Sequence, residues 1–150
     1  MPKFNTSKNL PYQAKDLFDL VLDIESYPEF LPWCNGARII SKNDDQITAE
    51  LQIKYKYLSF DYISNVKYHE LDGNYEIHVQ SKSYLFKYLK NSWQIKQMNE
   101  FSSINFDIDF DVKSKMLSKL IKIFFSYVAD TMINSFEKRA KQLFGKVDKD

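Results

Sequence analysis

A regular alternation of apolar and polar residues through the middle of the chain limits the folds that it can form. The clearest run covers residues 104–112, where these apolar positions alternate with polar ones: Ile104, Phe106, Ile108, Phe110 and Val112. The same period recurs in 47–55, 75–79 and, more weakly, 93–97. Because successive side chains of a strand point to opposite faces, the period predicts antiparallel strands with one buried face. With the turn-forming residues between these runs, about six strands are expected between Ala37 and Val112.

Helical patterns lie on both sides of these strands. A first helix is expected after Pro11 and should stop by Tyr27, because Pro28 disfavours a helical residue before it. A long second helix is predicted from Lys115 to Phe144, and a short edge strand at 3–9. The apolar face of the long helix is predicted to consist of Leu117, Leu120, Ile121, Phe124, Val128 and Met132, widened by Met116, Phe125, Tyr127 and Phe136.

This order of elements predicts one α+β domain over residues 1–150, with an ordered core at about 4–145, in which a curved sheet wraps the C-terminal helix. The 12 Phe, 10 Tyr and 2 Trp can fill a thick core or line a pocket for a bulky apolar ligand. Charge is balanced at +1, so DNA is not expected as a partner. We find no signal peptide and no run of about 18 apolar residues, and we expect a cytoplasmic protein.

Catalytic and metal-binding patterns are absent from the sequence. The three glycines lie too far apart for a phosphate-binding loop. His69 and His78 lack the spacing of a helical zinc site, and the alternating aspartates of 107–111 lack the glycine and glutamate of a calcium loop. Cys34, the one cysteine, excludes an internal disulfide and has no neighbouring base to activate it. We therefore expect no metal site, no cofactor and no enzymatic activity.

Two features stand apart from this pattern. Residues 27–34 carry three aromatic side chains and two prolines, so they form neither a regular helix nor a central strand. This segment is either a structural plug over the end of the sheet or the gated mouth of an apolar cavity. The long helix has an apolar face wider than the stripe of about 100° that packing on one sheet requires. It is either thoroughly buried or seated beside a ligand.

Residues 23–34, Asp-Ile-Glu-Ser-Tyr-Pro-Glu-Phe-Leu-Pro-Trp-Cys, resemble the signature of a family of coenzyme Q-binding proteins and bacterial ribosome association toxins. This family is part of the START-like, polyketide cyclase-like superfamily. Residues 124–145 are similar to its closing helix, and 86–93 to one of its strand pairs. The resemblance implies a helix-grip fold, in which a curved antiparallel sheet of six to seven strands surrounds the long helix with an apolar cavity between them.

For function, the resemblance implies non-enzymatic binding of ubiquinone or a similar polyisoprenoid lipid, in support of respiration as a quinone carrier or chaperone. Trp33 would stack on the flat head, and Met116 and Met132 would adapt to the tail. Ubiquinone would then be a bound ligand, and a transient contact with the inner membrane surface would accompany the role. The expected cavity and mouth residues are Tyr27, Pro28, Phe30, Leu31, Trp33, Phe86, Trp93, Phe124, Val128 and Met132.

A second role stays open. In some bacterial relatives the resemblance implies association with the large ribosomal subunit and inhibition of translation, as a toxin with a paired antitoxin. Lys115, Lys119 and Lys122 share one face of the long helix. Such a basic strip is compatible with contacts to ribosomal RNA and equally with an ordinary solvated face.

Overall fold

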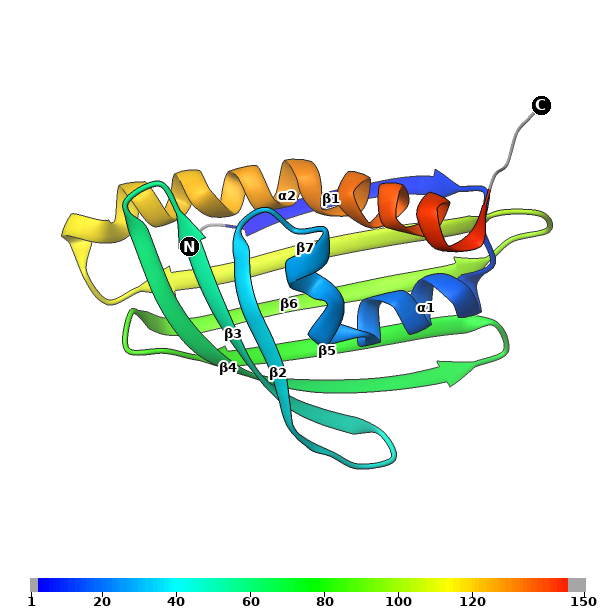
Figure 1. The fold of residues 1–150 in the computed structure, drawn as a ribbon, viewed down its shortest axis with the longest axis horizontal. Coiled ribbons are helices and arrows are strands. Elements are labelled where there is room, and N and C mark those ends of the chain that lie inside the picture. The colour runs from blue at the N-terminus through cyan, green and yellow to red at the C-terminus, as the bar shows by residue number, and fades with distance from the viewer. Residues whose placement is uncertain (1–2, 146–150) are drawn as a thin grey trace.

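The structure, a computed structural model, describes residues 3–145 as a seven-stranded antiparallel sheet and three helices (Figure 1). The strand order is β1-β7-β6-β5-β4-β3-β2, so β1 pairs with β7 at one edge of the sheet. This confirms the predicted α+β class and the N-terminal edge strand. The strands are β1 (Lys3–Leu10), β2 (Cys34–Lys42), β3 (Gln46–Tyr55), β4 (Leu58–Leu71), β5 (Asn74–Lys82), β6 (Phe86–Gln97) and β7 (Ser102–Val112).

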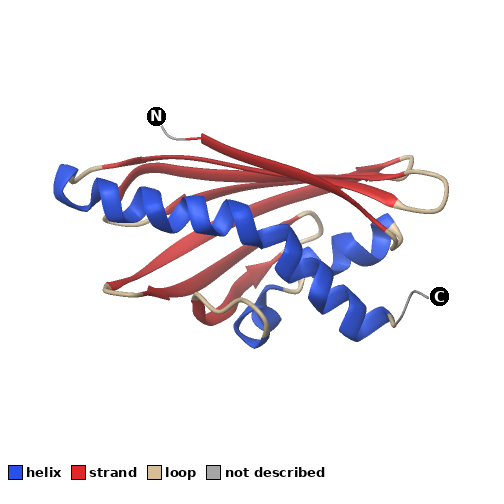
Figure 2. Ribbon diagram, turned by 90° about the horizontal axis from the view of Figure 1, so that it is seen from above, coloured by secondary structure: helices blue, strands red, loops and turns tan. Residues whose placement is uncertain are grey.

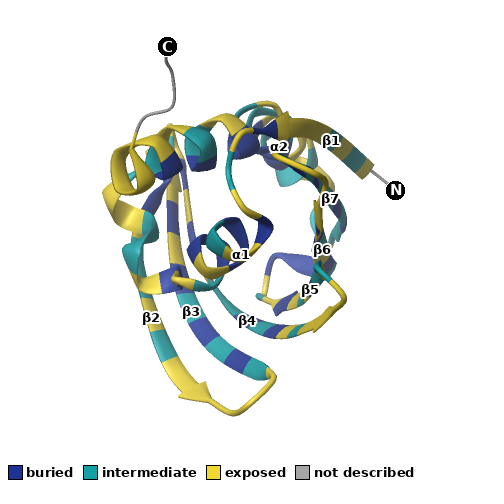
Figure 3. Cartoon of the chain, turned by 90° about the vertical axis from the view of Figure 1, so that its right-hand side faces the viewer, coloured by how far each residue is buried: buried dark blue, intermediate teal, exposed yellow. Residues whose placement is uncertain are grey.

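The alternation seen in the sequence places apolar side chains on one face of a bent sheet. In β7, Phe106 and Phe110 are fully buried, whereas Asp107 and Asp109 alternate with them and accept hydrogen bonds from the Ser92 and Tyr88 hydroxyls at 2.9 Å and 3.1 Å. The aspartates therefore belong to the polar face of the sheet. Register shifts in β2 and β6 bend the strands, and Figure 3 shows the sheet curling around the helices.

The N-terminal helical segment is divided in two. Helix α1 (Ala14–Leu22) is followed by η1, a 3-10 helix over Ile24–Glu29 that contains Pro28. Proline is tolerated there because the carbonyl of Tyr27 accepts hydrogen bonds from the N–H groups of Phe30 and Leu31, so the missing N–H of Pro28 leaves this turn intact. The Tyr27 hydroxyl donates to the carbonyl of Val21 and ties η1 back to α1. As predicted, the α-helix stops before Tyr27.

Helix α2 (Lys115–Phe144) has the predicted bounds and lies across the apolar face of the sheet (Figure 2). Its buried residues follow the predicted face from Ile121 onward. The prediction for Met116, that it lies in the apolar face and beside a ligand tail, is wrong. Met116 is 91% exposed because the first turn of α2 lies at the end of the fold (Figure 1). Within residues 3–145, no helix is long and apolar enough to cross a membrane.

Candidate functional site

Two hollows lie on opposite sides of the segment 24–33, between the sheet and α2. The inner one is a cavity of about 50 Å³, bordered by the sheet, the end of α1, this segment and α2. Most of its wall is aromatic or aliphatic. Its lining residues are Val21, Ile24, Tyr27, Trp33, Leu51, Tyr62, Ser64, Val66, Ile77, Val79, Asn91, Trp93 and Met132.

Hydrogen-bonding groups are placed at several points of the inner cavity wall. The indole of Trp33 is 5% exposed, and its Nε1 is buried with no hydrogen-bond partner within residues 3–145. Ser64 and Ser81, both buried, share a hydrogen bond of 2.9 Å between their hydroxyls. Burial raises the pKa of the Tyr62 hydroxyl, as does the neighbouring Cys34 to a smaller extent, so Tyr62 stays protonated at neutral pH. Residues that carry hydrogen-bonding groups, Trp33, Tyr62, Ser64 and Asn91, therefore line an otherwise apolar cavity.

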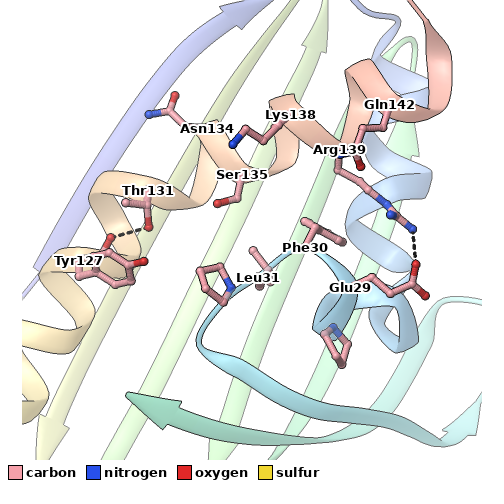
Figure 4. A pocket seen from close by; sticks show the side chains of 12 residues that line it. Glu29, Phe30, Leu31, Tyr127, Thr131, Asn134, Ser135, Lys138, Arg139 and Gln142 are labelled. Carbon is pink, nitrogen blue, oxygen red and sulfur yellow. Dashed lines mark hydrogen bonds and ion pairs between the residues drawn. The ribbon is translucent and has the colours of Figure 1, made fainter. Parts of the chain in front are cut away.

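The outer hollow is an open groove of about 540 Å³ between the same segment and the C-terminal half of α2 (Figure 4). Arg139 anchors it: its Nη2 lies 2.9 Å from Glu29 Oε1, and its guanidinium lies 5.2 Å from the centre of the Phe30 ring. The Arg139 Nε is buried and has no partner within residues 3–145. The groove is lined by Pro28, Glu29, Phe30, Leu31, Pro32, Tyr127, Thr131, Asn134, Ser135, Lys138, Arg139 and Gln142.

The segment 24–33 therefore forms a partition between cavity and groove. Tyr27 and Trp33 line the cavity, and Phe30 and Leu31 line the groove. Edge-on aromatic contacts hold the partition against α2, with ring centres 5.5 Å apart for Tyr27 and Phe136 and 5.0 Å for Phe30 and Phe136. The Arg139–Glu29 ion pair also joins the partition to α2, and the Glu25 carboxylate and the Trp33 carbonyl accept hydrogen bonds from the N–H groups of Ile39 and Lys54 in the sheet.

The ten expected site residues fall into three places. Tyr27, Trp33, Trp93 and Met132 line the cavity, whereas Pro28, Phe30 and Leu31 line the groove. Phe86, Phe124 and Val128 are buried in the packed core and line neither hollow.

Sequence reasoning missed three polar residues, Ser64, Ser81 and Asn91. Ser64 and Asn91 line the cavity, and Ser81 shares the hydroxyl hydrogen bond with Ser64. Each occupies a core-facing position of an alternating strand, and a polar residue at such a position is the signal that could have found them.

The reactive groups near the site are neutral or engaged. Burial raises the pKa of the Cys34 thiol to about 11, although a hydrogen bond with the Gly36 backbone opposes the shift, so the thiolate is scarce at neutral pH. Glu25 accepts a hydrogen bond of 2.8 Å from the Ile39 N–H, and Glu29 pairs with Arg139. Within residues 3–145, no three His, Cys, Asp or Glu side chains gather where they could hold a metal ion.

Comparisons with known proteins agree with this architecture. The ribosome association toxin RatA of Rickettsia prowazekii is 45% identical over 144 residues, which cover 95% of this chain and 99% of the toxin. The mitochondrial coenzyme Q-binding protein COQ10 of Dictyostelium discoideum is 29% identical over 143 residues, covering 93% of this chain and 69% of that protein.

Solved structures show the same fold. The 18 kDa protein CC1736 of Caulobacter crescentus has a TM-score of 0.72 at 28% identity and covers 97% of this chain and all of its own. A START superfamily protein of Mycobacterium smegmatis has a TM-score of 0.79 at 18% identity, covering 94% of this chain and 98% of that one. The family model of polyketide cyclases, dehydrases and lipid transport proteins matches residues 10–137, and the chain belongs to this START-like family.

Proposed function

We propose that this protein binds a lipid with a flat, hydrogen-bond-accepting head, of which ubiquinone and related polyisoprenoid quinones are the type. The head occupies the inner cavity and the protein acts as a carrier or chaperone in support of respiration. The coenzyme Q-binding protein among its relatives supports this choice of ligand.

The observation that carries the proposal is the unpaired Nε1 of Trp33. A buried donor without a partner costs about 1–3 kcal/mol, so proteins rarely keep one unless something else uses it. A quinone offers carbonyl oxygens that accept such a hydrogen bond and a flat ring that packs against aromatic side chains. Asn91 and Ser64 in the same wall supply further donors.

Binding requires the cavity to widen. A volume of about 50 Å³ is far below the roughly 300–1,000 Å³ of typical ligand pockets. The partition 24–33 is the wall that moves in our proposal, because its contacts with α2 are mainly aromatic packing. Its displacement joins the cavity to the groove, so that the head sits inside while the tail runs along α2. Met132 lies at the junction and has the flexibility to follow an irregular tail.

A carrier role fits the chemistry of the site better than catalysis. General acid–base or nucleophilic catalysis needs a group with a suitable pKa that faces the substrate. The Cys34 thiol has a pKa of about 11, and Glu25 and Glu29 are engaged in structural contacts. None of these three residues lines the inner cavity.

Trp33→Phe tests the proposal because it removes the N–H and keeps an aromatic ring. We expect it to weaken the binding of decylubiquinone, a short-tailed quinone, by about fivefold or more, the value of one hydrogen bond of about 1 kcal/mol. The control is Phe110→Leu, which trims a fully buried ring that lines neither hollow. Unchanged affinity in Trp33→Phe, or no lipid in organic extracts of the purified protein, would contradict the proposal.

A ribosome-binding role is the second candidate. Its support is the 45% identical relative named a ribosome association toxin, together with the exposed Lys115, Lys119 and Lys122 on one face of α2. If it is correct, the protein sediments with large ribosomal subunits in low salt and is released as salt rises. Protein that stays at the top of a low-salt sucrose gradient would rule this role out.

A further inference from the structure

Positive charge is concentrated at one end of the molecule. The β3–β4, β5–β6 and β7–α2 connections meet at the end drawn on the left of Figure 1. The three segments around them, 53–61, 82–90 and 109–122, together form what we name the basic end. They contain nine lysines and three aspartates, although the whole chain carries a formal charge of only +1. The rest of the chain is therefore net acidic, and the molecule has a strong charge asymmetry.

The basic end also exposes large apolar or aromatic side chains. Tyr57 is 99% exposed in the β3–β4 turn, Tyr84 is 73% exposed in the β5–β6 turn, and Met116 is 91% exposed in the first turn of α2. Single exposed side chains are ordinary, but here each of three adjacent connections carries one. None of them contributes to the core of this chain.

Six of the nine lysines at this end make neither an ion pair nor a cation–π contact within residues 3–145, whereas Lys56 and Lys90 lie 5.3 Å and 5.5 Å from the ring centres of Tyr55 and Tyr88. Within residues 3–145, only one of the nine lysines forms an ion pair: Lys87 Nζ lies 3.9 Å from Asp111 Oδ2. Lys115 lies in the first turn of α2, which has no acidic residue, and the helix dipole disfavours a cation there. Such a cluster of unpaired cations is self-repelling in the isolated protein and is relieved by an anionic partner.

We propose that the basic end docks on a membrane surface rich in anionic phospholipids. Tyrosine is favoured at the interface between headgroups and acyl chains, and Met116 adds an apolar side chain that enters the same region. The lysines around them reach outward to the phosphates. RNA is a poorer match, because neither of the two arginines lies in these segments and an exposed methionine has no role in phosphate contacts.

A chain of aromatic contacts leads from the basic end to the cavity. Tyr55, next to the β3–β4 turn, has its ring centre 5.2 Å from that of Tyr127 and 5.3 Å from that of Phe124. Phe124 in turn lies 5.8 Å from Trp33, which lines the cavity. Docking at this end thus places a lipid surface against side chains that support the cavity wall. The docking surface itself stands on exposure and charge, and does not depend on which ligand the cavity takes.

Binding to lipid vesicles tests the proposal. Vesicles of phosphatidylcholine with about 30% phosphatidylglycerol supply the negative surface, and vesicles of phosphatidylcholine alone are the uncharged comparison. One variant removes charge, with Lys56→Gln, Lys115→Gln and Lys119→Gln, and another removes apolar surface, with Tyr57→Ser and Met116→Ser. At about 5-fold per lysine, the first should bind anionic vesicles about 100-fold more weakly, and the second about 10-fold more weakly.

The opposite end of the molecule supplies matched controls. Leu71 and Met98 are 68% and 46% exposed there, so Leu71→Ser with Met98→Ser copies the apolar variant. Lys42→Gln, Lys67→Gln and Lys96→Gln copy the charge variant at exposed positions. Both controls should bind within twofold of the wild type, and melting temperatures check that every variant folds.

Three results would overturn the proposal. The first is a wild-type protein that ignores anionic vesicles. The second is an equal loss of binding in the control variants. The third is a protein that binds purified large ribosomal subunits and does not bind vesicles. If that binding depends on Lys115 and Lys119 and is unaffected by Met116→Ser, the basic end is an RNA-binding surface.

Discussion

Removing the hydroxyl of Tyr27 is the smallest change that should loosen the partition between cavity and groove. This hydroxyl donates to the Val21 carbonyl and ties η1 to the end of α1. Tyr27→Phe deletes that hydrogen bond and keeps the ring contacts with Phe30 and Phe136, at 6.0 Å and 5.5 Å between ring centres. If the partition must move for a ligand to enter, this hydrogen bond has to break when the partition opens. The free energy of opening is therefore lower in Tyr27→Phe, which lacks the bond.

The magnitude follows from one buried hydrogen bond. At about 1 kcal/mol, its loss should lower the free energy of unfolding by that amount and the melting temperature by about 2–4 °C. The same 1 kcal/mol taken from the opening equilibrium increases the open population about fivefold, and the association rate of decylubiquinone rises by the same factor. Stopped-flow quenching of tryptophan fluorescence measures the rate, and hydrogen exchange of residues 24–33 measures the opening.

A second hydrogen bond provides the control. Ser102 is fully buried and its hydroxyl donates to the Tyr12 carbonyl at 2.6 Å, away from the residues that line the cavity. Ser102→Ala should cost a similar amount of stability and leave the association rate unchanged. If both variants accelerate binding equally, or if Tyr27→Phe does not accelerate it, the partition is not a gate and the segment is a structural plug.

Two further predictions concern the core. Phe106→Ala removes a fully buried ring whose centre lies 4.7 Å from that of Trp93. Urea unfolding should show that the free energy of unfolding falls by about 3–5 kcal/mol, and a fall below about 1 kcal/mol would contradict the assigned core. Burial raises the pKa of the Cys34 thiol from 9.0 to about 11. Between these two pH values the unfolded state loses the thiol proton and the folded state keeps it, so the free energy of unfolding falls as pH rises from about 9 to about 11. Urea unfolding at pH 8 and pH 10.5 should therefore show a smaller fall for Cys34→Ala than for the wild type, and an equal fall would refute this cause.

Much of the fold could be read from periodicity. The 104–112 alternation and the Lys115–Phe144 helix are long, regular patterns, and long patterns average out local irregularities. Met116 shows where this reasoning fails: its spacing places it on the apolar face of the helix, but it is 91% exposed because the first turn of α2 lies at the end of the fold (Figure 1). Pro28 shows a second limit, since a proline ends an α-helix but is compatible with the 3-10 turn that follows it.

The candidate site was harder to predict because it depends on contacts between distant parts of the chain. The segment 27–34 stood out by composition, but its two sides, one facing a cavity and the other a groove, follow from how it lies against α2. Ser64 and Asn91 are ordinary strand residues until the sheet brings them to one wall. The basic end was hidden by a net charge of +1, since its segments meet only through the antiparallel topology.

The indole N–H signals of the two tryptophans test the central claim most directly. In a nitrogen–proton correlation spectrum, Trp33→Phe assigns one signal to Trp33 and leaves the other to Trp93. Titration with decylubiquinone should shift the Trp33 N–H signal downfield in a saturable manner, because this donor gains the hydrogen-bond partner that it lacks in the free protein. A Trp33 signal that stays in place while the protein is saturated with quinone would contradict the claim that the inner cavity holds the head.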